Sequence, residues 1–339
     1  MMNIDQLREQ FPDEEACRSF FESIIWRNGR LCPHCGFQRN YPISGKTSRA
    51  GLYECGRCKR QFTVTTKTTM HSTKLSLWKW LLAMYYIVHS SKGISSLFLA
   101  KWIGVTQKTA WKLGHAVREM MDPGPEGQPI LSGTVELDEK YFGGKPRHKV
   151  GVRYKVGKGT DKQAVLVAVE RHGPVRPALL EGAKTEELQP WVERFVQKEA
   201  HLMTDENYAY RKIGQQFASH AWVKHSIEEF ARGDVHNNTA ESFSSLLERA
   251  KLGVFHHMSK KHLSRYLNEI GFRWDHRLPK EQVTKNGTRK TVMVPMPVMK
   301  KFCSLLSRAF GRQLRWTLNG GIRRLTPIRL EEYQPLFGI

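Results

Sequence analysis

The stretch Val135-Glu136-Leu137-Asp138-Glu139-Lys140-Tyr141-Phe142-Gly143-Gly144 decides the fold of this chain. Thr134 to Phe142 alternate imperfectly between apolar and polar side chains, as a half-buried β-strand does. The glycine pair that follows ends the strand. Asp138 lies in mid-strand, where acidic residues are depleted. Taken alone, Asp138 is either an edge-strand aspartate that faces water or a residue kept for its chemistry.

Two further carboxylates follow at the ends of other predicted elements. Asp205 ends the apolar run that begins at Leu202, and Glu241 lies at the start of a helix that Asn238 opens. Three carboxylates on separate elements are what a two-metal phosphoryl-transfer site needs. We therefore predict that Asp138, Asp205 and Glu241 are catalytic and bind Mg²⁺ or Mn²⁺. The alternative for Glu241 is a capping box with Asn238, in which it only satisfies backbone donors.

Composition favours a polyanionic partner. The 339 residues are enough for two or more domains, and 54 Lys and Arg against 32 Asp and Glu give a net charge of +22. Nucleic acid is the usual partner of such a charge, although a merely basic surface is the alternative. The 40% hydrophobic content excludes wholesale disorder. Because no apolar run of 18 residues and no signal peptide are evident, we expect no membrane association and a cytoplasmic, nucleoid-associated protein.

Four of the six cysteines form two CxxC pairs, Cys32-Pro33-His34-Cys35 and Cys55-Gly56-Arg57-Cys58. Each pair aims two sulfurs at one point, and Zn²⁺ takes four such ligands in a tetrahedron. Short strands around the second pair favour a zinc ribbon over a redox CxxC. We expect one structural Zn²⁺ on Cys32, Cys35, Cys55 and Cys58, with His34 at the surface.

A helix-turn-helix is predicted between the zinc ribbon and the catalytic stretch. Ile94 to Ile103 leads into Gly104-Val105, and Thr106 caps a second helix. In that motif the first residues of the second helix meet base edges. The candidates for DNA contact are Gln107, Lys108, Thr109 and Lys112. A plain helical hairpin is the alternative.

The pattern becomes strand-rich after the break at Asp122-Pro123-Gly124-Pro125. A basic loop from Lys145 to Lys162 follows the first strand, and Lys145 and Lys149 in it are candidates for phosphate contact. Three strands, a helix, a strand, a helix, a strand and a final helix is the order of a ribonuclease H-like domain. The predicted fold class is therefore α/β: a ribonuclease H-like mixed sheet flanked by helices, preceded by a zinc ribbon and a helix-turn-helix.

We expect five segments along the chain. After residue 279 the sequence predicts a polar, loop-like segment to Pro297 and a basic amphipathic helix from Met299 to Leu318, whose role stays open. The segments are an N-terminal helical segment (1–30), the zinc ribbon (31–70), the helix-turn-helix region (71–125), the catalytic domain (130–279) and a basic C-terminal segment (280–339).

The chain resembles bacterial insertion-sequence transposases that join an N-terminal zinc ribbon to a DDE catalytic domain. The resemblance covers about residues 8 to 277. Its motifs are Phe11 to Cys17 before Cys32-Pro33-His34-Cys35-Gly36, Lys108-Thr109-Ala110-Trp111, Glu136 to Glu139 before Gly143-Gly144-Lys145, Thr204-Asp205-Glu206 before Tyr210, His236 to Phe243, His256 to Leu263, and Tyr266-Leu267-Asn268-Glu269. Two positions depart from the family. Ser244 stands where a second aromatic is usual, and Glu248 where a Lys is usual.

The resemblance implies cleavage of the element's DNA ends followed by strand transfer, without a covalent protein–DNA intermediate. One metal would activate water and then a DNA 3′-OH, and the other would stabilise the leaving oxygen. It also implies DNA as partner, at the element ends and the target, with Asn238 among the contacts, and a homo-oligomer of at least two copies. Two alternatives are a ribonuclease H-like nuclease that cuts without joining and a DNA-binding regulator with an inactive catalytic domain.

Overall fold

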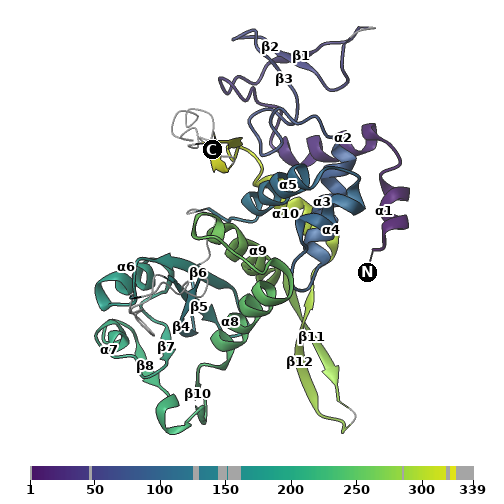
Figure 1. Ribbon diagram of the computed structural model, residues 1–339. Coiled ribbons are helices and arrows are strands. Elements are labelled where there is room, and N and C mark those ends of the chain that lie inside the picture. Colours follow the sequence, from purple (N-terminus) through teal and green to yellow (C-terminus); the bar gives the residue numbers. More distant parts are fainter. Residues whose placement is uncertain are drawn as a thin grey trace. The chain divides into compact units, whose positions relative to one another are not determined.

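The computed structural model describes residues 2–45, 48–124, 130–143, 151, 162–284, 286–317 and 321–325. The chain forms two compact units, shown in Figure 1. The first unit combines Met1–Asp122 with Met296–Ile339, and the second is Pro123–Pro295.

The first unit begins with two helices and a small zinc-ribbon sheet. Helix α1 spans Ile4–Gln10 and α2 spans Glu14–Ile25, with Asp13 as the N-cap of α2, as the sequence predicts. Strands β1 (Asn40–Pro42), β2 (Tyr53–Cys55) and β3 (Gln61–Phe62) pair antiparallel in that order.

Three helices and a C-terminal extension complete the first unit. Helices α3 (Leu77–His89), α4 (Ser96–Ile103) and α5 (Gln107–Met120) follow the ribbon. Helix α4 ends at Gly104, whose φ of 64° suits a residue without a Cβ. Thr106 then caps α5, and its side chain accepts a hydrogen bond from the Thr109 N–H. The two helices and the short turn predicted for a helix-turn-helix are therefore present, and contact of this motif with DNA stays a prediction. Helix α10 (Val298–Ser307) and the paired strands β13 (Leu314–Trp316) and β14 (Ile322–Arg324) belong to this unit.

The second unit is built on a five-stranded sheet in the order β6-β5-β4-β7-β8. Strands β4 (Thr134–Phe142), β5 (Gln163–Glu170) and β6 (Val175–Leu180) are mutually antiparallel, whereas β7 (His201–Thr204) and β8 (Ser219–Trp222) run parallel to β4. Its helices are α6 (Thr185–Phe195), α7 (Ala209–Gly214), α8 (Asn238–Ala250) and α9 (Leu263–Asp275). This is the ribonuclease H-like topology that the sequence predicts.

Each face of this sheet carries its own hydrophobic core, because side chains alternate between faces along a strand. Val135 and Leu137 pack with α6 and α7, whereas Phe142 and the valines of β5 pack with α8 and α9. Figure 1 shows the resulting order of helices, sheet and helices. The shorter elements are the ribbon β9 (Ala231–Arg232) with β10 (Val235–His236), 3₁₀ turns at His225–Ile227 and Lys260–His262, and a π-helical turn at Lys251–Phe255.

Three boundaries that the sequence pattern predicts are wrong. The pattern predicts a helix that Thr185 caps and that runs to about Ala200, but Lys184 is the N-cap of α6 and the helix ends at Phe195, because Val196 forms a parallel bridge with Leu131. The pattern also predicts a strand at Trp222–His225, but β8 is Ser219–Trp222, because its pairing with β7 fixes the register.

The segment after residue 276 also differs from its prediction. The polar stretch forms a hairpin of β11 (Arg277–Val283) and β12 (Arg289–Pro295). Helix α10 ends at Ser307, well before Leu318, because Phe310 bridges Thr68 and Gly311 adopts a φ of 72°. An exposed hairpin has no buried face, so its alternation leaves little hydrophobic signal.

Candidate active site

Asp138 lies on the central strand of the sheet, with only 8% of its surface exposed. The interpretation of Asp138 as an edge-strand residue that faces water is therefore wrong. Its neighbours Val135 and Leu137 point into the core beneath α6 and α7, so Glu136 and Asp138 point to the opposite face. That is the face covered by α8.

Asp205 follows the strand next to β4. In the parallel pairing of β4 with β7, Glu136 lies opposite Met203, and two residues beyond that pair come Asp138 and Asp205. Neighbouring strands lie about 4.8 Å apart, so the two aspartates sit at the same level of the sheet. The Asp205 Oδ1 accepts a 3.0 Å hydrogen bond from the Asn207 N–H, which holds the turn after the strand.

Glu241 lies in the first turn of α8, but the predicted capping box does not form. The N-cap is Asn237 rather than Asn238, and no side chain of the helix caps it. The Glu241 carboxylate instead lies 3.5 Å from the His225 Nε2, with 44% of its side chain exposed. Glu241 is thus free of a capping role, and Asn238 is an exposed residue at the helix start.

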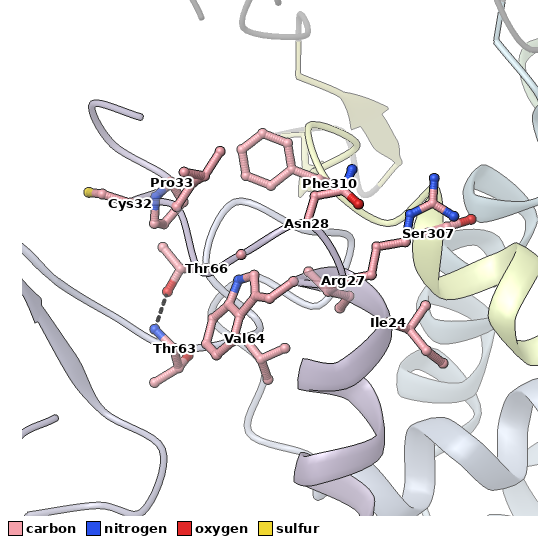
Figure 2. A pocket seen from close by; sticks show the side chains of 14 residues that line it. Ile24, Arg27, Asn28, Cys32, Pro33, Thr63, Val64, Thr66, Ser307 and Phe310 are labelled. Atoms are coloured by element: carbon pink, nitrogen blue, oxygen red, sulfur yellow. Dashed lines mark hydrogen bonds between the residues drawn. The ribbon is translucent and has the colours of Figure 1, made fainter. Parts of the chain in front are cut away.

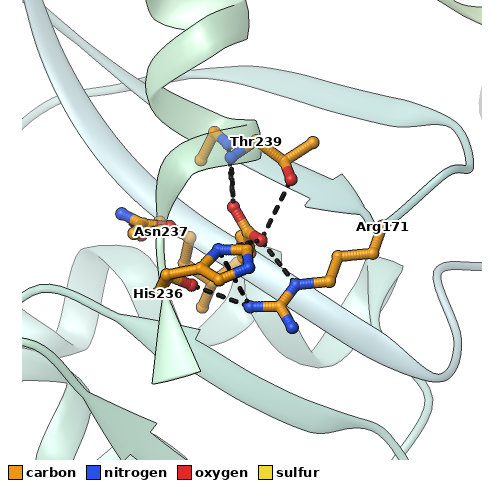
Figure 3. Close-up of polar contacts among 7 residues, drawn as sticks. Arg171, His236, Asn237 and Thr239 are labelled. Atoms are coloured by element: carbon orange, nitrogen blue, oxygen red, sulfur yellow. Dashed lines mark hydrogen bonds and ion pairs between the residues drawn. The ribbon is translucent and has the colours of Figure 1, made fainter. Parts of the chain in front are cut away.

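Glu136 performs the capping that the sequence assigns to Glu241, at the helix start where Figure 3 labels Thr239. This fully buried carboxylate accepts hydrogen bonds from the backbone N–H of Thr239 (2.6 Å) and of Ala240 (3.0 Å). It also accepts from the Thr239 hydroxyl and from the Arg171 Nε at 2.6 Å. Arg171 donates in turn to the carbonyl of His236, just before the helix. This network joins the start of α8 to the strand that carries Asp138.

Asp138 itself has two close partners. The Ser244 hydroxyl, buried on α8, donates a 2.9 Å hydrogen bond to the Asp138 Oδ2, and the Lys140 Nζ lies 3.7 Å from the same oxygen. Burial raises the pKa of Asp138 above its usual range, with Lys140 and Ser244 acting against that rise. The charges of Asp205 and Glu241 raise the pKa of Asp138 further.

Among the described residues, only the four cysteines bring three or more ligand atoms within 4.8 Å of one another. The ligand atoms of the three carboxylates therefore do not form a closed cluster in this structure. Oxygen ligands of this kind suit Mg²⁺ or Mn²⁺. The Asp138 carboxylate is buried with one ammonium, that of Lys140, 3.7 Å away, and a divalent cation beside it would offset its negative charge, so the residues present fit such an ion.

The cysteine cluster has the form of a structural zinc site. The Cys32 and Cys58 sulfurs lie 3.7 Å apart, and those of Cys35 and Cys55 lie 3.6 Å apart. The N–H groups of the two knuckles donate to the Cys32 and Cys55 sulfurs. Four thiolates fill a tetrahedral shell, which leaves no open position for chemistry. The cluster packs against Trp26, Tyr53 and Phe62.

Cys32 also borders a pocket of about 250 Å³ within the first unit. Figure 2 shows Cys32 and Pro33 on one wall, with Arg27 and Phe310 also lining the space.

The predicted DNA-contacting residues have different surroundings. The Gln107 Nε2 donates a 2.8 Å hydrogen bond to the Ser96 hydroxyl, and the Thr109 hydroxyl pairs with that of Thr106. The hydrogen bonds of Gln107 and Thr109 therefore lie within the two-helix motif itself. Lys108 and Lys112 instead lie beside the Trp316 ring, with their Nζ atoms 5.0 Å and 5.8 Å from its centre. Lys145 and Lys149 lie outside the described residues.

Comparison with known proteins agrees with this architecture. The family described as the ISXO2-like transposase domain matches residues 130–275, and the transposase zinc-ribbon domain matches residues 12–61. The two matches cover the second unit and the ribbon separately. The chain therefore belongs to the insertion-sequence transposases that join an N-terminal zinc ribbon to a DDE domain.

A curated relative comes from an insertion element as well. The chain is 29% identical over 276 residues to an uncharacterized protein in transposable element ISH50 of Halobacterium salinarum. The alignment covers 78% of this chain and 91% of that protein.

Two solved structures are also similar. The first is the Mos1 strand transfer complex, at 14% identity over 57% of this chain and 72% of that one, with a TM-score of 0.25. The second is a pre-cleavage Mos1 transpososome, at 14% identity over 56% of this chain and 72% of that one, with a TM-score of 0.23. Scores this low support no conclusion.

Three residues near the carboxylates escape prediction from the sequence: Glu136, Arg171 and His225. Glu136 lies two residues before Asp138, so both side chains point to the same face of the strand. That period-2 spacing is the one sequence signal that places Glu136 near Asp138. Among the described helices, none has the length and apolar character needed to cross a membrane.

Proposed function

We propose that Asp138, Asp205 and Glu241 are the catalytic carboxylates of this transposase and hold two divalent metal ions during cleavage and joining of DNA. The observation that carries the proposal is the position of Asp138. It is buried on the central strand, beside the strand that leads to Asp205, and it faces the helix that bears Glu241. Burial of a carboxylate costs free energy, and ionisable groups in such surroundings cluster at functional sites.

The side chains divide the work of holding the metals. Asp138 is the best placed to serve both ions, because its strand is central in the sheet, next to β7, and its side chain contacts α8. Asp205 would hold one ion from the strand end, and Glu241 the other from the helix start. When bound, such a pair of ions activates the attacking oxygen and neutralises charge on the leaving oxygen of an in-line displacement.

Neighbouring residues orient these ligands. Ser244 fixes one carboxylate oxygen of Asp138, and Glu136 fixes the helix that presents Glu241. Lys140 supplies positive charge near Asp138, which lowers the cost of keeping that buried carboxylate ionised.

The first unit would bind the DNA. Its zinc ribbon and helix-turn-helix are separate from the carboxylates, and Lys108 at the start of α5 is exposed. The net charge of +22 supports a polyanionic partner. Joining of two element ends requires that they be held together, so we propose that at least two copies assemble on DNA.

A joining assay separates this function from its rivals. The substrate is a duplex with a pre-cut 3′ end that carries the DNA flanking the coding sequence of the chain, incubated with a target plasmid and Mg²⁺. A transposase joins the two molecules, whereas a nuclease only nicks the plasmid. A regulator with an inactive catalytic domain binds the duplex but neither joins it to the plasmid nor nicks the plasmid. Either of the last two results contradicts the proposal.

A further inference from the structure

The C-terminal strands β13 and β14 lie against the second helix of the helix-turn-helix. The Trp316 ring stacks on Trp111 of α5, with ring centres 5.9 Å apart and an interplanar angle of 22°. At the other end of α5, the Arg324 guanidinium pairs with the Asp122 carboxylate at 3.1 Å. Arg312 donates to the carbonyls of Glu119 and Asp122. The strand pair is thus fixed along the length of the helix.

The two faces of this strand pair differ in character. Leu314 and Ile322 are buried, and together with Trp316 they form the face that packs on the unit. Arg315 and Arg323 point the other way, as the alternation along a strand requires, and both are exposed.

Arg315 and Arg323 lie directly opposite each other in the antiparallel register. Side chains so placed have Cβ atoms about 5 Å apart, and like charges there destabilise the pair. Within the part of the chain that the structure describes, neither arginine forms an ion pair with a carboxylate. The charge of Arg315 also helps to lower the pKa of nearby His71, after the larger effect of burial.

Helix α5 itself supplies a second pair of cations, Lys108 and Lys112. Lys108 and Lys112 are one turn apart and both approach Trp316, so the positive charges of the helix lie beside the strand pair. The acidic residues of α5, Glu119 and its neighbour Asp122, lie at the far end and are bound by Arg324. Among the described residues, positive charge without an acidic partner is therefore concentrated at the end of α5 where the motif would meet bases.

We propose that β13 and β14 form a wing that binds the phosphate backbone of duplex DNA beside the helix-turn-helix, with Arg315 and Arg323 as the contact residues. The proposal rests on the DNA-binding role given to the first unit above. A bound phosphate removes the repulsion between the two arginines, and phosphate contacts fix the register of a reading helix on the duplex.

The opposite role, a cover that blocks α5, fits the strand pair less well. A cover would carry acids to neutralise Lys108 and Lys112 or would bury them. The described residues 311–317 and 321–325 contain no Asp or Glu, and Lys108 stays exposed.

Equilibrium binding of the full chain to a labelled duplex of arbitrary sequence, measured at several salt concentrations, tests the wing. We expect Arg315→Ala/Arg323→Ala to reduce the slope of log Kd against log salt by about 2, since each phosphate contact contributes about 0.9. The control Arg8→Ala/Lys300→Ala removes the same charge from exposed positions of α1 and α10 and should leave the slope unchanged. The pair Arg315→Lys/Arg323→Lys should keep most of the slope, because the charge remains.

Each other outcome has a distinct meaning. An unchanged slope in Arg315→Ala/Arg323→Ala, beside a steep slope for the unmodified chain, overturns the wing and leaves the proposed function intact. Tighter binding by that variant shows that the strand pair is a cover. A shallow slope for the unmodified chain contradicts the DNA-binding role on which the wing depends.

Discussion

At the scale of single residues, Asp138 stood out as a candidate because its strand leaves a period-2 pattern and acidic residues are depleted in mid-strand. The strand Thr134–Phe142 has the predicted bounds. The partners of Asp138 were not predictable in the same way. Ser244 lies 106 positions further along the chain, and no local pattern records a contact of that range. Glu136 likewise satisfies donors of a helix more than 100 residues away.

The hydrogen bond from Ser244 to Asp138 should matter for metal binding more than for folding. We expect Ser244→Ala to leave the fold intact and to raise the Mg²⁺ concentration for half-maximal joining about 10- to 100-fold, as loss of a ligand's hydrogen-bond partner does elsewhere. Titration of joining with Mg²⁺ measures this effect. Ser245→Ala, at the exposed neighbouring position, is the control. Equal Mg²⁺ requirements for Ser244→Ala and the unmodified chain would show that the contact does not position Asp138.

Glu136 should be a residue on which the stability of the second unit depends. Glu136→Gln keeps the shape but leaves the largely buried Arg171 without its carboxylate, which costs about 3 kcal/mol. At about 2–4 °C per kcal/mol for a unit of this size, thermal unfolding should begin about 6–12 °C lower. Glu248→Gln, at an exposed position of α8, should change the transition by less than about 0.5 kcal/mol. Scanning calorimetry of the two variants gives the comparison, and equal transitions would contradict the role of Glu136.

At the scale of elements, the order of strands and helices in the second unit was predictable, but several ends were not. Strand β8 and helix α6 end where a partner strand or bridge fixes them, and the chain carries no local record of that partner. The hairpin of β11 and β12 is exposed on most of its residues, so it lacks the apolar alternation that marks a buried strand. The prediction of a capping box at Glu241 was wrong for a related reason. Glu136, from β4, accepts the hydrogen bond of the Thr239 N–H at the helix start, and the local sequence does not show this distant partner.

Glu248 on helix α8 stands where the family usually has a Lys, and restoring the Lys offers a gain-of-function test. This residue is exposed about two turns beyond Glu241, and no described cation pairs with it. Arg249 donates to the Ser245 carbonyl and Lys251 to the Gly143 carbonyl instead. We expect Glu248→Lys to tighten binding of a pre-cut end several-fold at low salt, because it replaces repulsion of phosphate by attraction. Unchanged affinity in a gel-shift titration would show that Glu248 lies away from the DNA.

The zinc ribbon offers a test of metal as a structural element. Its buried apolar content is small, so the ribbon depends on four metal–sulfur bonds for its fold. The full chain should contain one Zn²⁺ per molecule by elemental analysis, and Cys55→Ser should lose that zinc. Cys303→Ser, at an exposed cysteine of α10, should retain it. Zinc retained by Cys55→Ser would contradict the four-cysteine assignment.

At the scale of the whole molecule, composition predicted that the partner is a polyanion. The order of the motifs predicted which part of the chain binds DNA and which part carries the carboxylates. A net charge of +22 indicates a polyanion but not where it binds. The structure adds that Met296 to Ile339 returns to the first unit, so residues from both ends of the chain build the unit that holds the helix-turn-helix. No composition or periodicity predicts that return, since it depends on contacts between α10 and α2, α3 and α5.

The central claim is that Asp138, Asp205 and Glu241 together hold two divalent ions. Anomalous diffraction from crystals of the full chain soaked in Mn²⁺ tests it most directly, because the ions are located without reference to activity. We expect two Mn²⁺ peaks about 3.5–4 Å apart among the three carboxylates, with Asp138 as a ligand of both. Asp138→Asn crystals treated alike should lose both peaks while the sheet stays unchanged. Peaks at other residues, or none beside Asp138, would contradict the account.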